Sequence, residues 1–500
     1  MAAFKTGPTG PTGPLGPLCR TGRTGRKGRT GRTGCKALTA LTAPAALATS
    51  LMLAGCSFIP TYERPAAPVA ASFPGAGAGS ASNAVQVADL AWADFLGEAR
   101  LRALVDLALK NNRDLRIATL NVEQVRAQWG LQRADLLPTV GAGVQGGSSP
   151  VNGGNQRIHT AGLQVSAFEA DLFGRVRSLS EAASARFLAS DEGRRAAQVA
   201  LVAVVANAEL ALRADDELLR ITESTLAARQ ETLRLSQVRF DGGVAAEPEL
   251  RTAQSLLAAA QVSVAALKRQ RAQDLNALVL LLGQPLPSEL PAAPALGASS
   301  LRELPVGLPS DVLLQRPDIR QAEQTLMAAN ANIGAARAAF FPRISLTGSV
   351  GFASGELKGL FDNTVWSFTG QLLQPLFDAG RNQANLDGAR AGREIAVAQY
   401  EKAIQTAFRE VADALAGRAT LGDQLTAQRA QAEAETRRLA LAELLFKGGA
   451  ASALDRLDAE RSALAAQQAV VQLQLAQLQN QVLLYRVLGG GAGPGLVTMR

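Results

Sequence analysis

The sequence predicts an α+β membrane protein built from a duplicated unit, and three observations support that fold class. First, residues 174–247 and 376–493 contain no proline and consist mostly of residues that favour helices, so each run predicts very long helices. Second, each run follows a pair of short segments in which apolar and polar residues alternate, as they do in β-strands. Third, this order of elements occurs twice along the 500 residues.

The net charge of +8 comes from the first 55 residues of the chain. They hold eight Lys and Arg and no Asp or Glu, so the other 43 basic residues balance 43 acidic ones. A neutral folded part lacks the basic surface of a nucleic-acid-binding domain. We therefore expect no nucleic acid among the partners.

Residues 1–55 are typical of a secretory leader. A basic lead-in precedes an apolar run of small residues at 37–54, and Leu53-Ala54-Gly55 stands directly before Cys56. This ending resembles a bacterial lipobox, which implies cleavage before Cys56 and a covalent lipid on that residue. A short membrane helix is the alternative interpretation.

Glycine recurs at every third residue from Gly7 to Gly34, with a break at Cys19. The pattern is collagen-like, but it lies upstream of the expected cleavage, and a misassigned start codon would explain it equally well. Cys19 and Cys35 also lie upstream. A mature chain that begins at Cys56 would have no free thiol, so we expect no metal site and no cofactor other than the covalent lipid.

Residues 56–88 are rich in Pro, Ala, Gly and Ser, which predicts a flexible, lipidated tether. The first repeat spans 89–283. It contains a helical start near Asp89, a β-hairpin at about 139–170 and a long helical hairpin at 174–283.

A proline-rich, irregular equatorial connector at 284–317 separates the two repeats. The second repeat spans 318–490, with a β-hairpin at about 343–375 and a long helical hairpin at 376–488. Residues 491–500 form a tail.

Apolar residues occupy every second position in both predicted β-hairpins, for example from Val140 to Val144 and from Ile344 to Phe352. Trp366 in the second hairpin could anchor a strand at a membrane interface. Strands of about 10 residues with one apolar face fit a membrane-spanning hairpin. Taken alone, the first hairpin would fit a half-buried surface hairpin equally well.

Sequence matches support the duplication. Residues 113–116 match 317–320 at an offset of 204, and the turn at 240–243 matches 446–449 at an offset of 206. Each half therefore contributes two strands. Four strands cannot close a membrane barrel and open edges are not tolerated in lipid, so the chain must oligomerise, and three copies would supply twelve strands.

Three motifs carry a resemblance to a known family. They are Gln-Arg-Pro-Asp-Ile-Arg at 315–320, Ala-Phe-Phe-Pro-Arg-Ile-Ser at 339–345 and Phe-Asp-Ala-Gly-Arg at 377–381. With the duplicated unit and the lipobox, they resemble the TolC-like outer membrane factors, in particular the lipoprotein branch (OprM/NodT-like) that serves resistance-nodulation-division efflux pumps.

The resemblance implies a homotrimer with a 12-stranded β-barrel in the outer membrane, continued by a long periplasmic α-helical barrel. It implies an exit duct for drugs or other small toxic compounds, anchored by the lipid at Cys56. The expected partners are a periplasmic adaptor (membrane fusion) protein, an inner-membrane pump and outer membrane lipid.

The resemblance also assigns candidate site residues. The turns Asp241-Gly242-Gly243 and Lys447-Gly448-Gly449 would dock the adaptor at the periplasmic tip. Asp455 and Asp458 share a helix face, and threefold symmetry would turn them into two carboxylate rings that act as a periplasmic gate. Arg461 is the candidate partner of Asp458. The alternative is that these charges form an ordinary solvated helix face.

Other functions fit the sequence less well. The chain has one histidine, His159, and lacks a phosphate-binding loop, a nucleophile elbow and metal-ligand spacing, so an enzyme is not expected. A lipid-anchored coiled-coil scaffold would explain the long helices but not the two hairpins. A duct for type I protein secretion is the remaining alternative.

Overall fold

The computed structural model describes residues 57–74, 87–151, 154–298, 301–304 and 310–491. The expected leader, the lipidation residue Cys56 and the tail beyond Gly491 lie outside these residues.

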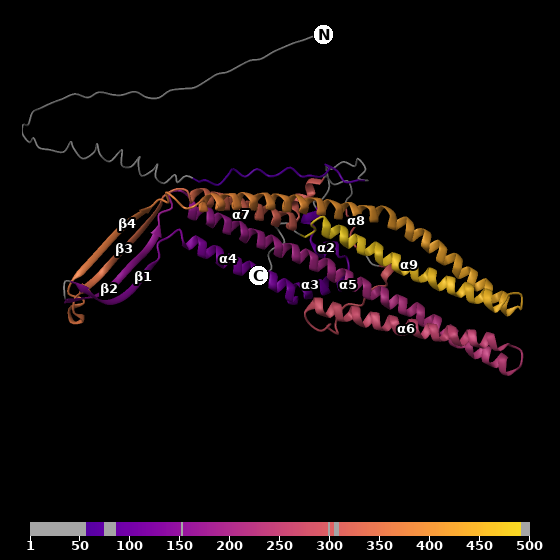
Figure 1. Cartoon of the computed structure of the whole chain (residues 1–500). Coiled ribbons are helices and arrows are strands. Elements are labelled where there is room, and N and C mark those ends of the chain that lie inside the picture. Colours follow the sequence, from indigo (N-terminus) through magenta and orange to yellow (C-terminus); the bar gives the residue numbers. More distant parts are fainter. Residues whose placement is uncertain (1–56, 75–86, 152–153, 299–300, 305–309, 492–500) are drawn as a thin grey trace, which may run out of the picture. The chain divides into compact units, whose positions relative to one another are not determined.

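Four antiparallel strands form one sheet in the order β1-β2-β3-β4 (Figure 1). The strands have 12, 16, 12 and 10 residues, so each reaches the length that a tilted strand needs to cross a bilayer. Both predicted β-hairpins are confirmed, and they join edge to edge through β2 and β3. The bounds are β1 (Val140–Val151), β2 (Gly154–Glu169), β3 (Arg343–Ser354) and β4 (Thr364–Leu373).

The two faces of the sheet differ in polarity. One cross-strand row pairs Leu163 with Val350 and Val350 with Trp366, and all three side chains are at least half exposed. The next row, which points to the opposite face, pairs Ser349 with Ser367, and their hydroxyls share a hydrogen bond of 2.8 Å. The sheet therefore has one apolar and one polar face.

A β-bulge interrupts the alternation of β2 between Val165 and Phe168. Ala167 has a positive φ of 49°, and Phe168 pairs with Leu346. Sequence alternation predicts Ala167 on the apolar face. The bulge instead gives that position to Phe168, because one extra residue reverses the facing of those that follow.

Helices follow each hairpin, and α5 and α8 have 67 residues each, or about 100 Å at 1.5 Å per residue. Each turns back into a shorter antiparallel helix, α6 or α9 (Figure 1). The bounds are α4 (Arg113–Ala134), α5 (Arg175–Asp241), α6 (Glu247–Leu282), α7 (Pro317–Ala338), α8 (Arg381–Lys447) and α9 (Ala453–Val487).

α8 begins five residues later than the proline-free run, because Asp378 caps it. The Asp378 carboxylate accepts hydrogen bonds from the backbone nitrogens of Gly380 and Asn382 at 3.0 and 2.9 Å. The helical start expected near Asp89 is divided into three short elements. They are η2 (Val87–Asp89), α2 (Trp92–Phe95) and α3 (Ala99–Asn111).

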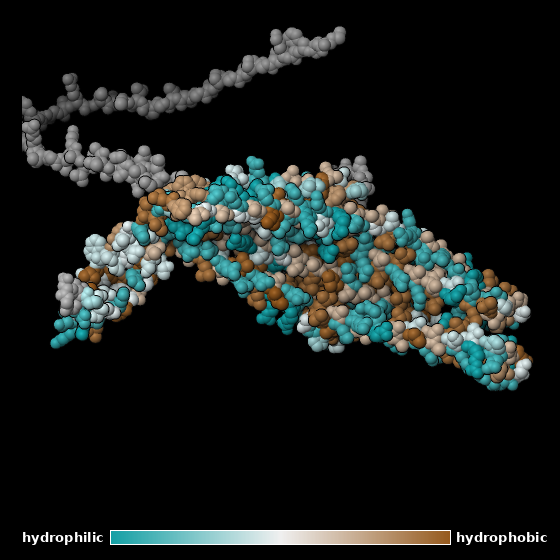
Figure 2. All heavy atoms as spheres, viewed as in Figure 1, coloured by the Kyte–Doolittle hydropathy of each residue, from teal (hydrophilic) through white to brown (hydrophobic). Residues whose placement is uncertain are grey.

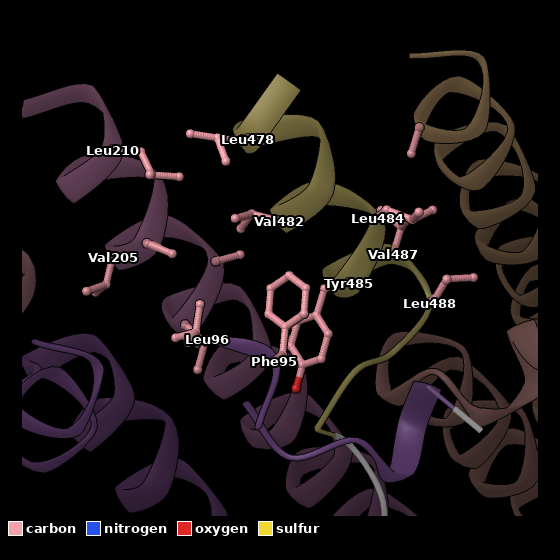
Figure 3. Packing of buried hydrophobic residues seen from close by; sticks show 14 of the residues in the cluster. Phe95, Leu96, Val205, Leu210, Leu478, Val482, Leu484, Tyr485, Val487 and Leu488 are labelled. Atoms are coloured by element: carbon pink, nitrogen blue, oxygen red, sulfur yellow. The ribbon is translucent and has the colours of Figure 1, made fainter. Parts of the chain in front are cut away.

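The main core lies where α2, α3, α5 and α9 meet (Figure 3). The rings of Phe95 and Tyr485 stack with their centres 4.2 Å apart, and the Tyr485 hydroxyl donates to the Leu90 carbonyl at 2.8 Å. Among the described residues, α5 alone is long and apolar enough to cross a membrane, but half of its most apolar 18-residue window is buried in the fold.

Residues 57–74, which we call the strap, are not a flexible tether: their first part packs along α7, and Phe73 near their end stacks on a ring of α8. The Phe58 ring stacks on Phe341 at 4.7 Å, and the Arg64 guanidinium forms two hydrogen bonds of 2.7 and 3.1 Å with the buried Glu323 carboxylate. The high content of Pro, Ala, Gly and Ser in residues 57–88 predicts flexibility, but a few side chains within the strap, such as Phe58 and Arg64, hold it against the helices.

Candidate functional site

The two helical hairpins turn in the same way. Gly243 and Gly449 have φ values of +75° and +76°, a left-handed conformation in which glycine has no side chain to clash. The backbone nitrogen of the next residue donates back into the helix, from Val244 to Arg239 at 2.9 Å and from Ala450 to Leu445 at 2.8 Å. These bonds end α5 and α8 with Schellman-type caps.

Apolar side chains are exposed on both sides of these turns. The polar turn residues are exposed as well: the Asp241 carboxylate accepts a hydrogen bond from Gln237 at 2.8 Å, and Lys447 faces solvent. An exposed apolar patch of this kind is typical of a docking surface. Its members are Val238, Phe240, Val244, Leu441, Leu444, Leu445 and Leu454.

Asp458 lies within a small charge network. Its carboxylate accepts hydrogen bonds from Arg461 on the same helix at 2.8 Å and from Arg438 on α8 at 2.9 Å. The side chain of Asp458 is 47% exposed. The predicted contact with Arg461 is confirmed, whereas Arg438, which also contacts Glu435, was not predicted.

Asp455 has a different local role. Its carboxylate accepts hydrogen bonds from the backbone nitrogen and hydroxyl of Ser452 at 3.1 and 2.7 Å, while its own nitrogen donates to the Ser452 hydroxyl at 3.2 Å. This capping box starts α9. The same two hydrogen bonds to the carboxylate hold the pKa of Asp455 below its ordinary value. The structure therefore does not unite Asp455 with Asp458 in one network.

Two of the contacts that tie α9 to α5 lie in the first half of α9. The Arg229 guanidinium of α5 donates to Glu460 of α9 at 3.0 Å, and Arg456 of α9 donates to the Thr232 hydroxyl of α5 at 3.3 Å. The Arg456 guanidinium also lies 5.1 Å from the ring centre of Phe446, a cation–π distance. We call these contacts the latch. Its members come from distant parts of the chain, so no local pattern reveals them.

A groove of about 940 Å³ runs between α5 and the α8/α9 hairpin. Its wall contains the latch residues Arg456, Glu460 and Thr232, together with Phe446 and Lys447 near the second turn. Charged, hydroxyl and apolar groups all line it. The turns, the carboxylates of α9 and this groove thus lie within one region of the helical hairpins.

Comparisons with known proteins show which proteins this chain is similar to. The chain is similar to the solvent efflux pump outer membrane protein SrpC of Pseudomonas putida, with 46% identity over 88% of this chain and 96% of that protein. Its similarity to the outer membrane protein OprJ of Pseudomonas aeruginosa is 43% identity over 90% of this chain and 96% of that protein.

Solved structures resemble the fold as well. The open state of the Neisseria gonorrhoeae MtrE outer membrane channel has a TM-score of 0.81 and 40% identity, covering 89% of this chain and all of that one. A membrane protein from Pseudomonas aeruginosa gives a TM-score of 0.82 with 42% identity over 89% of this chain and all of that one. The Outer membrane efflux protein family matches residues 104–284 and 308–490, and the chain therefore belongs to that family.

Proposed function

We propose that this chain is the outer membrane exit channel of a tripartite efflux system, exporting drugs or other small toxic compounds. The observation that carries the proposal is a sheet with one apolar and one polar face, continuous with two 67-residue helices. Such a sheet suits a barrel wall between lipid and an aqueous lumen. The names of relatives such as the solvent efflux protein SrpC support the same function.

Open edges support assembly into a trimer. Within the described residues, β1 and β4 each pair with one strand only, and an open sheet edge is not tolerated in lipid. Three copies would close a 12-stranded barrel, and their helices would continue it as an α-helical barrel in the periplasm. The matching lengths of α5 and α8, and of α6 and α9 at 36 and 35 residues, support the internal duplication.

The surface of α4 also supports a trimer. This 22-residue helix has no buried residue, and it exposes Ile117, Leu120 and Leu131 by 56, 51 and 68%. On the face drawn in Figure 2, hydrophobic residues reach the surface of the helices in several patches among polar ones. Neighbouring copies of the chain would cover such patches.

The turns at Gly243 and Gly449 would dock a periplasmic adaptor, which links the channel to an inner-membrane pump. Their exposed apolar surroundings suit that role. Asp458, with Arg461 and Arg438, would form the periplasmic gate, and Asp455 would hold the start of α9 that carries it. A covalent lipid at Cys56 would enter the bilayer beside the sheet, because the strap begins against Phe341, two residues before β3.

The test is deletion of the gene in its own bacterium, followed by complementation. We expect higher accumulation of antibiotics and solvents in the deletion strain, and recovery of the chain from outer membranes as a heat-resistant trimer. A soluble, all-helical product would support a scaffold instead. Normal drug accumulation, together with loss of a protein from the culture medium, would support a type I secretion duct.

A further inference from the structure

The apolar face of the sheet is hollowed beside the loop between β3 and β4. A groove of about 390 Å³ has a floor of small residues on β1 and β2, while Phe361, from the loop between β3 and β4, forms a wall. The Phe361 ring meets Phe352 edge-on at 5.3 Å and remains 69% exposed. The lining residues are Ala142, Gly143, Val144, Ala161, Gly162, Leu163, Phe352 and Phe361.

Cationic and hydrogen-bonding side chains follow the groove along β2. Arg157 and His159 stand four and two residues before Ala161, so the period of two places them on the same face as the groove floor. Arg157 is exposed, and in the described part of the chain no acidic side chain pairs with it. The distance along the strand from Arg157 to Ala161 is about 13 Å.

The order of helices and strands along the chain determines which leaflet of the membrane the strand turns would face. β1 follows α4 and β2 leads into α5, so the helices join the sheet at the end opposite its turns. If the helices lie in the periplasm, as the proposed function requires, the turns face the outer leaflet. Phe361 of the β3–β4 loop and Arg157, three residues after the start of β2, then lie toward that leaflet, while the groove reaches down to Ala142 near the start of β1. The characteristic lipid of that leaflet is lipid A, a phosphorylated glycolipid with several acyl chains.

We propose that this groove holds one acyl chain of lipid A, while Arg157 and His159 bind one of its phosphates. The alanines and glycines of the floor leave a channel for a hydrocarbon chain, and Val144 and Leu163 add apolar surface beside it. An Arg guanidinium forms strong, charge-assisted hydrogen bonds with phosphate oxygens, and the His159 imidazole can donate another. The β3–β4 loop also contains Lys358, but the neighbouring acids Glu356 and Asp362 offset its positive charge. The phosphate contacts therefore come from Arg157 and His159.

The experiment uses full-length trimers extracted from outer membranes in mild detergent, with lipid binding counted by native mass spectrometry. The probes are purified lipid A and, as the second lipid source, phosphatidylglycerol. We expect the unaltered protein to bind lipid A more tightly than phosphatidylglycerol. The Arg157→Glu variant, and the Ala142→Leu variant whose larger side chain fills the floor of the groove, should each bind lipid A about tenfold or more weakly. Phe361→Ala, in an exposed loop, should also weaken binding by removing the wall.

Two control variants lie on the same sheet outside the groove. Val140→Leu enlarges an apolar side chain on the same face, and Arg343→Ala removes a cation at the opposite end of β3. Both should bind lipid A as the unaltered protein does. Equal binding of phosphatidylglycerol, or full retention of lipid A by Arg157→Glu, would overturn the lipid A site.

The same variants would also reveal a different occupant of the groove. If a side chain of the neighbouring subunit fills the groove, Ala142→Leu should change the heat stability of the trimer and leave lipid A binding unchanged, which overturns the proposal. The lipid A site rests on the proposed function, but different experimental results would contradict the site and the function. Recovery of the chain from the soluble fraction would overturn both, whereas outer membrane trimers without selective lipid A binding would overturn the groove alone.

Discussion

Arg229 of α5 and Glu460 of α9 form an ion pair of 3.0 Å with only 12 and 15% of their side chains exposed. The other end of the Arg229 guanidinium donates to the Leu256 carbonyl of α6 at 2.9 Å. One side chain therefore joins three helices, including the α9 helix that carries Asp458. Any motion of the α8/α9 hairpin away from α5 must break this pair.

We predict that Arg229→Ala loosens the periplasmic end of the channel. The change leaves Glu460 largely buried without its cation, a local cost of about 1–3 kcal/mol. Single-channel conductance and sensitivity to a large antibiotic such as vancomycin should both rise. Glu460→Gln should act in the same direction, and the double variant should add little to either single change, since both remove one interaction.

Arg220→Ala is the matched control for the latch. Its partner Glu217 lies three residues away on the same helix, so the pair joins no two helices, and the side chains of Arg220 and Glu217 are 67 and 36% exposed. This variant should leave conductance unchanged. Equal conductance in all of these variants would show that the latch does not hold the channel closed.

The two carboxylates of α9 should respond differently to mutation. Asp458→Asn removes a charge from the proposed gate and should lower the preference of the channel for cations in bilayer recordings. Ser452→Ala removes the N-cap of α9, which costs about 1 kcal/mol and should leave ion selectivity unchanged. Asp387→Asn is a matched control, because Asp387 also pairs with an arginine three residues onward on an exposed face. If Asp458→Asn keeps the cation preference, Asp458 is only part of a solvated face.

Much of the fold could be predicted because its signals are local. Alternation locates the strands, absence of proline locates the long helices, and paired glycines mark the turns. The capping box was also readable, since Ser452 stands three residues before Asp455. The latch could not be predicted, because Arg229 and Glu460 are separated by 231 residues and only packing brings them together. The bulge at Ala167 was missed because the alternation of Leu163 and Val165 extends as far as Ala167, and only the adjacent apolar Phe168 breaks it.

Detachment of the strap can be measured by proteolysis. Glu323→Gln weakens the hydrogen bonds that hold Arg64, and Gly334→Ala places a methyl group about 2.5 Å from Cγ1 of Ile59 in the strap. In both variants, a Glu-specific protease should cleave after Glu63 roughly tenfold faster, because cleavage follows the population of the detached strap. Glu356, in the loop between β3 and β4, provides an internal control whose cleavage should not change. Equal cleavage rates after Glu63 would mean that other contacts hold the strap.

The last prediction concerns Asp215 of α5, which is buried against Asp274 of α6. Burial, a side-chain hydrogen bond with Asp274 and the negative charges of Asp274 and Asp216 raise the pKa of Asp215 to about 7, against the opposing effect of Arg271. Between the ordinary carboxyl pKa of about 4 and this value, the folded chain binds more protons than the unfolded chain. Stability should therefore fall as pH rises through this window.

Asp215→Asn imitates the protonated carboxyl group and should remove this decline. The measurement is the temperature at which the heat-resistant trimer dissociates, taken at pH 5, 6, 7 and 8. The dissociation temperatures of the variant and of the unaltered protein should agree most closely at pH 5. At pH 8 the variant should dissociate a few degrees higher, because about 1 kcal/mol shifts the midpoint of a mid-sized domain by about 2–4 °C. Asp423→Asn, which changes an exposed carboxylate on α8, should run parallel to the unaltered protein. Parallel curves for Asp215→Asn as well would show that the proton shared between α5 and α6 does not stabilise the hairpin.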